Sequence, residues 1–238
     1  MYRPIPNEIF HVHTWRCEHA GEEQDYEYVE KAIELGADRI VFTDHCPFPG
    51  NPFRKRMRIE QLDEYVASLE QLRRDYGDKI EILIGLEVEY LPSFEDYYKE
   101  LKKSGRFDLL IVGQHFFEHE NGAWSITDKD KSNEHIGLAR AIVKAAKTGY
   151  FDVIAHPDRV YIRRKNWADD MIEPGREIIR AATEHGLYLE KNYSSMFKNK
   201  YWQEFWELEP VDKYLYGYDV HSVGALQDIW KMHNVENC

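Results

Sequence analysis

Short apolar segments alternate with longer amphipathic segments along the whole chain. The apolar segments predict seven strands, at Ile9–Val12, Arg39–Phe42, Ile80–Leu86, Leu109–Val112, Val153–Ala155, Leu187–Leu189 and Leu215–Tyr218. Apolar residues between them recur at helical spacing, as in Leu62, Tyr65, Val66, Leu69 and Leu72. This alternation predicts an α/β protein in which helices connect successive parallel strands.

Glycines mark the boundaries between these predicted elements. Each follows a helical stretch and precedes an apolar segment: Gly36, Gly77, Gly105, Gly149 and Gly186. Glycine adopts positive φ readily at this position after a helix.

Seven strands without a linker or a change in composition favour one domain over residues 1–238, folded as a distorted (βα)7 TIM-like barrel. An open, doubly wound sheet is the alternative.

Composition and charge narrow the possible partners. The chain has 238 residues, of which 43% are hydrophobic and 31% charged, as in ordinary globular domains. No apolar run approaches the roughly 20 residues of a membrane span, and the N-terminus lacks the apolar core of a signal peptide. Cys17, Cys46 and Cys238 form no disulfide framework, so we expect a cytoplasmic protein. A net charge of −12 argues against nucleic-acid and membrane partners.

Nine residues with metal-binding side chains lie along the chain. They are His11, His13, His19, His45, Glu87, His115, His156, Asp219 and His221. All except His19, which lies in the first loop, are at or just after the C-terminal end of a predicted strand, where α/β barrels carry their active sites. Side chains two residues apart on a strand share a face. His11 with His13, and Asp219 with His221, can therefore bind one ion or two adjacent ions.

The donor types indicate the metal and the reaction. Mixed imidazole and carboxylate ligands suit Zn, Mn or Fe better than Mg or Ca. Three divalent ions carry six positive charges, against two negative charges from Glu87 and Asp219. The excess favours bound hydroxide and a small anionic substrate, and a phosphorylated one fits best. A metal-bound water, with its pKa lowered toward roughly 7, would be the nucleophile. The sequence has no GxSxG or CxxxxxR motif that would supply a Ser or Cys nucleophile.

Charged residues beside the predicted ligands are further candidates. Arg159 could hold a phosphate oxygen or form a surface salt bridge. Asp158 could orient a ligand imidazole, protonate the leaving alkoxide or cap the following turn. Asp44 and Glu89 are expected to support neighbouring ligands rather than bind metal. The basic cluster Arg54–Arg58 is interpreted as a solvated charge run, with a substrate-attracting flap as the alternative.

Together these motifs resemble the polymerase-and-histidinol-phosphatase (PHP) family. The similar pieces, in family order over nearly the whole chain, are His11-Val-His13, His19, Thr43-Asp44-His45, Gly85-Leu-Glu87, Gly113-Gln-His115, His156-Pro-Asp158 and Asp219-Val-His221. The resemblance implies a distorted seven-stranded βα barrel with a trinuclear site. It assigns the first ion to His11, His13, Glu87 and Asp219. Glu87 would bridge to the second ion, with His115 and His156. The third ion would be held by His19, His45 and His221.

Longer stretches are similar to the histidinol-phosphatase branch of that family. These are residues 42–49, 57–65, 85–98 and 151–159. This resemblance implies a phosphomonoesterase that acts on L-histidinol phosphate. Two segments depart from the pattern of that branch. Residues 112–115 differ from its usual sequence, and segment 190–198 lacks an arginine that is expected there. The alternatives are a phosphatase for phosphotyrosine or sugar phosphates, a nuclease-type phosphodiesterase, and a non-catalytic metal-binding module.

Overall fold

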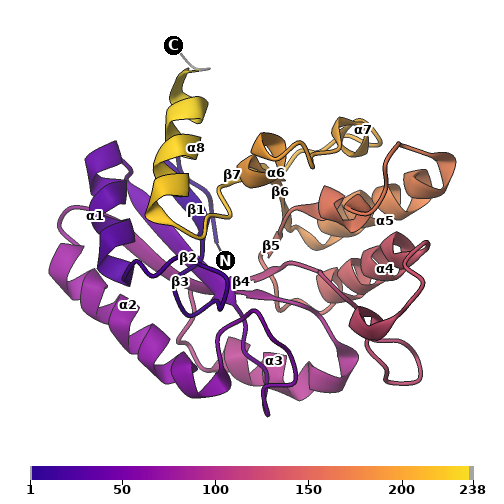
Figure 1. Cartoon of the computed structure of the whole chain (residues 1–238), viewed down its shortest axis with the longest axis horizontal. Helices are drawn as coiled ribbons and strands as arrows, with labels where there is room; N and C mark the ends of the chain where they lie inside the picture. Colours follow the sequence, from indigo (N-terminus) through magenta and orange to yellow (C-terminus); the bar gives the residue numbers. More distant parts are fainter. Residues whose placement is uncertain (1, 236–238) are drawn as a thin grey trace. The chain divides into compact units, whose positions relative to one another are not determined.

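The computed structural model describes residues 2–235, so Cys238 lies outside the described part. The strands among these residues are β1 (Glu8–Val12), β2 (Arg39–His45), β3 (Glu81–Val88), β4 (Leu109–Val112), β5 (Val153–Ile154), β6 (Tyr188–Asn192) and β7 (Tyr214–Gly217). The helices are α1 (Asp25–Leu35), α2 (Leu62–Tyr76), α3 (Glu95–Lys103), α4 (Glu134–Ala146), α5 (Ile172–His185), α6 (Tyr193–Phe197), α7 (Gln203–Trp206) and α8 (Val223–Val235). The strands follow chain order in the sheet. The alternation of strands and helices predicted from the sequence is confirmed (Figure 1).

The chain divides into two compact units. Unit 1 comprises Met1–Glu87, Arg106–Leu109 and Tyr216–Cys238, and unit 2 comprises Val88–Gly105 and Leu110–Leu215. In unit 1, β1 pairs in parallel with β2, β2 pairs with β3, and α1 packs against α2 and α8. In unit 2, β4 pairs in parallel with β5, β5 pairs with β6, and α4 packs against α5 (Figure 1). The single domain expected over residues 1–238 stays a prediction.

The glycine signals are confirmed at four of the five positions. Gly36, Gly105, Gly149 and Gly186 have φ values of 81°, 67°, 74° and 73°. The prediction was wrong for Gly77, whose φ is −66°. There, glycine serves close packing, because an added Cβ would lie 2.5 Å from the carbonyl oxygen of Arg73.

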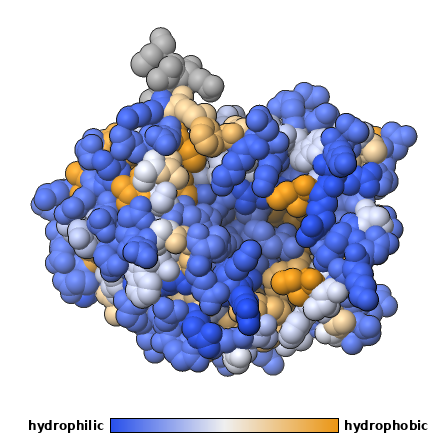
Figure 2. Space-filling view, in the orientation of Figure 1, coloured by the Kyte–Doolittle hydropathy of each residue, from blue (hydrophilic) through white to orange (hydrophobic). Residues whose placement is uncertain are grey.

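Two observations concern the hydropathy of the helices and of the surface. No helix within residues 2–235 is long and apolar enough to cross a membrane. Figure 2 shows a face covered mainly by hydrophilic residues, with only scattered apolar ones.

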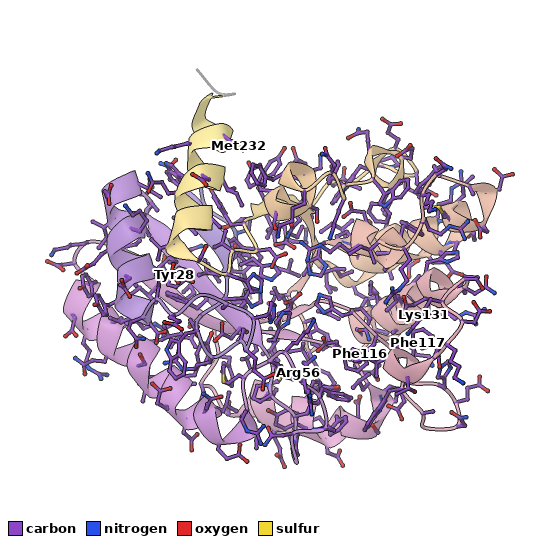
Figure 3. The ribbon with its side chains drawn as sticks, in the orientation of Figure 1. Tyr28, Arg56, Phe116, Phe117, Lys131 and Met232 are labelled. Atoms are coloured by element: carbon purple, nitrogen blue, oxygen red, sulfur yellow. The ribbon has the colours of Figure 1, made fainter. Side chains whose placement is uncertain are left out.

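The basic cluster Arg54–Arg58 is only partly a solvated charge run. Arg54 and Arg58 are exposed, whereas Arg56 is buried with 7% exposure. Its Nη1 donates a hydrogen bond of 3.1 Å to the carbonyl of Cys46. Its guanidinium also lies 5.4 Å from the ring centroid of Phe48. Figure 3 labels Arg56 among the side chains of the structure. The interpretation as solvated charge was therefore wrong for Arg56, whose apolar stem and planar head pack inside unit 1.

Candidate metal centre

Seven of the nine predicted ligands form one cluster in unit 1: His11, His13, His19, His45, Glu87, Asp219 and His221. His13 lies at its centre. The centroid of its ring is 4.9 Å from that of His11, 4.5 Å from that of His45 and 4.2 Å from that of His221. The ring of His19 reaches the same cluster from the first loop, 4.5 Å from His221. The ends of β1, β2, β3 and β7 thus bring these side chains together.

The two carboxylates of the cluster face the imidazole nitrogens. Glu87 Oε2 lies 3.4 Å from His11 Nε2, 3.5 Å from His13 Nε2 and 3.0 Å from His45 Nδ1. Asp219 Oδ1 lies 3.3 Å from His13 Nε2. Several imidazole nitrogens therefore lie close to two carboxylate oxygens. A bound cation is the usual reason for such an arrangement of metal-binding atoms.

The donor set fits a divalent metal. Among the described residues, the buried Nε2 atoms of His13 and His221 make no hydrogen bond. Buried nitrogens without a partner need an explanation, and a bound ion is one. Three sets of three residues in the described part of unit 1 have ligand atoms within 4.8 Å of one another: His13, His45 and His221; His11, His13 and Asp219; and His13, Cys17 and Asp44. Imidazole with carboxylate is the donor chemistry of Zn, Mn and Fe.

Desolvation keeps three of these imidazoles in the neutral form that binds metal. Desolvation, followed by the nearby His221 and His45 rings, lowers the pKa of His13 well below its usual range. Desolvation and His45 lower the pKa of His19 to about 4. Desolvation lowers the pKa of His221 to about 3, although Asp219 acts in the opposite direction. Neutral histidines at neutral pH do not have to lose a proton before they bind an ion.

The backbone is unusual at two of these positions. His11 has a φ of 71° and Asp219 a φ of 50°, in the left-handed region that non-glycine residues seldom occupy. The pairing of β1 with β2 shifts register between Phe10 and Val12, at His11. The expectation that His11 and His13 face the same way is confirmed, because both rings reach Glu87 and Asp219. Regular strand alternation is not the reason, since His11 lies at the register shift and His13 lies beyond β1. Such strain tends to persist at functional sites, where the surrounding structure holds it in place.

Unit 2 contains the other two predicted ligands. The rings of His115 and His156 have centroids 5.2 Å apart. His115 Nδ1 lies 3.0 Å from Oε1 of Glu89, so Glu89 contacts a predicted ligand, and its supporting role stays a prediction. The backbone N–H of His156, which has a φ of 31°, donates to Oε2 of Glu190 at 2.7 Å. Carboxylates that orient ligand histidines are common around metal sites.

The predicted catalytic pair, Asp158 and Arg159, also lies in unit 2. Oδ2 of the fully buried Asp158 accepts a hydrogen bond from the backbone N–H of Trp202 at 2.9 Å. Its Oδ1 makes no hydrogen bond within residues 2–235. Burial raises the pKa of Asp158 to about 7, against the lowering effects of the Trp202 hydrogen bond and of Arg159. Asp158 is therefore partly protonated near neutral pH.

Arg159 is anchored by segment 190–198, which departs from the family pattern. Its Nε donates to Ser195 Oγ at 2.9 Å, and its Nη2 donates to Asn192 Oδ1 at 3.0 Å. Asn192 Nδ2 in turn donates to Glu190 Oε2 at 3.2 Å. The sequence reasoning did not assign roles to Glu190, Asn192 or Ser195. The available signal was the charged residue Glu190 directly after the sixth apolar segment, and the structure places it fully buried in β6.

Comparison with known proteins identifies the family. The model of the PHP domain family matches residues 10–194, and the chain belongs to that family. A "Probable histidinol-phosphatase" of Deinococcus radiodurans is 28% identical over 218 residues, which cover 74% of this chain and 81% of that protein. The histidinol-phosphatase of Bacillus subtilis is 33% identical over 92 residues, or 36% of this chain and 34% of that protein.

Solved structures show the same fold. A candidate histidinol phosphatase from Listeria monocytogenes has a TM-score of 0.74 and 20% identity, with 95% of this chain and 99% of that chain covered. Histidinol phosphate phosphatase from Lactococcus lactis, complexed with Zn, L-histidinol and phosphate, has a TM-score of 0.67 and 22% identity. That alignment covers 95% of this chain and 93% of the other. The predicted class, an α/β barrel of the (βα)7 type, is confirmed.

Proposed function

We propose that this chain is a metal-dependent phosphomonoesterase that hydrolyses L-histidinol phosphate to L-histidinol and phosphate in histidine biosynthesis. The observation that carries the proposal is the buried cluster of imidazoles and carboxylates around His13 in unit 1. The histidinol-phosphatases among its relatives support the choice of substrate. A cytoplasmic location and the absence of a nucleic-acid partner stay predictions from the sequence.

For the metal centre we propose three divalent ions, of Zn, Mn or Fe, on the nine residues that the family resemblance assigns. His11, His13, Glu87 and Asp219 would hold one ion. His115 and His156 would join Glu87 at the second, and the third would be bound by His19, His45 and His221. When bound, such ions lower the pKa of a coordinated water and offset the charge of the phosphate. The lowered pKa values of His13, His19 and His221 support this assignment.

Two residues of unit 2 would act on the substrate directly. Arg159 would bind a phosphate oxygen, because Ser195 and Asn192 fix the plane of its guanidinium. Asp158 would protonate the departing alkoxide, since its raised pKa keeps a proton available near neutral pH. Glu190 supports both His156 and, through Asn192, Arg159.

Replacing Arg159 with lysine tests its proposed contact. R159K keeps the charge and loses the planar fork, and a lost charged hydrogen bond costs about 1.5–3 kcal/mol. We therefore expect kcat/KM for L-histidinol phosphate to fall about 10- to 100-fold, mainly through KM. The matched control is R180K, which alters an exposed arginine of α5 paired with Glu173 and Glu209. An unchanged KM in R159K would remove the proposed phosphate contact.

A panel of phosphate esters tests the choice of substrate. Metal-loaded protein is incubated with L-histidinol phosphate, a phosphotyrosine peptide, a sugar phosphate and a dinucleotide, and released products are measured. The proposal predicts the highest kcat/KM for L-histidinol phosphate. Preference for phosphotyrosine is the main competing result, because segment 190–198 lacks the expected arginine. Cleavage of the dinucleotide alone would indicate a phosphodiesterase, and no cleavage at all would indicate a non-catalytic module.

A further inference from the structure

An ionic network in unit 1 is joined by hydrogen bonds to residues next to the ligand cluster. Its centre is Arg16, whose side chain is only 1% exposed. Arg16 belongs to the loop between β1 and α1, which carries His13 at its start and His19 farther along. This loop contains no helix or strand that could fix the two histidines by itself.

All five N–H groups of the Arg16 guanidinium have acceptors. Nη1 and Nη2 donate to the two carboxylate oxygens of Asp25, each at 2.8 Å. Nε and Nη2 donate to the two oxygens of Glu64, at 2.7 and 2.9 Å. The remaining N–H, on Nη1, donates to Thr14 Oγ1 at 2.9 Å. The loop is thereby tied to the first residue of α1 and to α2, in a fork geometry that only arginine provides.

The network continues from Thr14 to Asp44. The backbone N–H and the hydroxyl of Thr14 both donate to the carboxylate of Asp44, and both residues are fully buried. Thr14 follows His13 directly, and Asp44 precedes His45 directly. The series of hydrogen bonds from Arg16 through Thr14 to Asp44 therefore links the backbone next to His13 with the backbone next to His45. The rings of these two predicted ligands lie 4.5 Å apart.

The charges of the network suit a neighbouring cation site. An unpaired arginine this close to bound divalent ions would repel them. Here the carboxylates of Asp25 and Glu64 take up the charge of Arg16 in two bidentate pairs, and Asp44 adds a further negative group through Thr14. Arg16 can thus fix the loop without opposing the ions.

We infer that Arg16 is a positioning residue that holds the β1–α1 loop, through Thr14 and Asp44, in the conformation in which His13, His19 and His45 retain metal. The inference rests on the proposed function only through the identity of these ligands. Supporting residues around a metal site typically contribute 10- to 100-fold to its affinity. Loosening the network should therefore speed the loss of ions even while the protein stays folded.

The test measures metal retention in R16K and Thr14→Val. R16K keeps the charge but cannot fill five acceptors, and Thr14→Val removes the hydroxyl that joins Arg16 to Asp44. The proteins are loaded with Zn, ions are counted by elemental analysis, and transfer to a chromophoric chelator is followed in time. We expect release at least about tenfold faster than wild type for both variants. Melting temperatures of the loaded proteins verify that each is folded.

Two control variants separate positioning from general stability. Thr14→Ser restores the hydroxyl and is expected to retain Zn as wild type does. R73K removes another guanidinium of unit 1, which contacts Asp108 and the carbonyl of Ile82. Wild-type release rates in both R16K and Thr14→Val, or equally fast release in R73K, would overturn the inference. If R16K does not fold, the comparison of Zn release rates between Thr14→Val and Thr14→Ser decides the inference by itself.

Because no phosphate ester is present in this assay, its result is separate from that of the proposed function. Wild-type protein that binds Zn but hydrolyses no ester would overturn the proposed function and leave the role of Arg16 standing. Wild-type protein that hydrolyses L-histidinol phosphate, with R16K and Thr14→Val equally retentive, would overturn the inference alone.

Discussion

Replacing His13 with alanine is expected to lower kcat for L-histidinol phosphate by on the order of 10³-fold, equivalent to about 4 kcal/mol of transition-state stabilisation. His13 belongs to all three sets of potential ligands in the described part of unit 1 whose atoms lie within 4.8 Å of one another. Its Nε2 faces Asp219 at 3.3 Å and Glu87 at 3.5 Å. Removal of this ring would therefore leave both carboxylates and the adjacent imidazoles without their central partner.

The measurement for this variant is steady-state phosphate release together with metal content. H13A should contain less metal than wild type at the same free metal concentration. The matched control, His185→Ala, removes an exposed histidine at the end of α5 and should keep wild-type activity. A folded H13A with more than a tenth of wild-type kcat would contradict the central place of His13 in the site.

The second large effect is expected for Asp158→Asn. General acids typically contribute 10²- to 10⁴-fold, so kcat for L-histidinol phosphate should fall by about that factor. Asparagine keeps the size of the side chain and the acceptor for the Trp202 N–H, but it cannot deliver a proton as a carboxylic acid does. 4-Nitrophenyl phosphate has a leaving group that needs no proton, so its hydrolysis should be little affected.

The pH dependence follows from the same group. Burial raises the pKa of Asp158 to about 7, so the carboxyl is protonated below that pH and loses its proton above it. A general acid acts in the protonated form, and wild-type kcat should therefore decline as the pH rises through about 7. D158N should lack this decline, whereas Asp128→Asn, which alters the partner of His119, should retain it. If D158N lost equal factors in kcat for L-histidinol phosphate and for 4-nitrophenyl phosphate, a structural role for Asp158 would be indicated instead.

The strands could be predicted because parallel strands buried on both faces appear as continuous apolar runs. Their ends were less predictable. β2 continues to His45 because Thr43 and Asp44 are buried despite being polar, which hydropathy alone does not indicate. Gly77 was misjudged because α2 ends there with a right-handed residue, φ −66°, close to the carbonyl of Arg73 one turn earlier, and glycine in the sequence does not distinguish this ending from a left-handed one.

The residues of the candidate metal centre could be found in the sequence because strand ends and donor chemistry are local properties of the sequence. Seven of the nine meet in unit 1, and His115 and His156 lie together in unit 2. The supporting residues could not be predicted in the same way. Arg16 and Glu64 are 48 positions apart, and Arg159 and Ser195 are 36 apart. No periodicity pairs such residues, so only the three-dimensional structure reveals that they are partners.

The central claim is that bound divalent metal makes this chain a phosphatase for L-histidinol phosphate. The most direct measurement is phosphate release from L-histidinol phosphate by metal-free protein to which Mn or Zn is added in known equivalents. We expect negligible release without metal, and a rise that levels off at about three equivalents, the number of ions proposed for the imidazole and carboxylate donors of this site. Release that does not depend on metal, or no release at any metal content, would contradict the central claim.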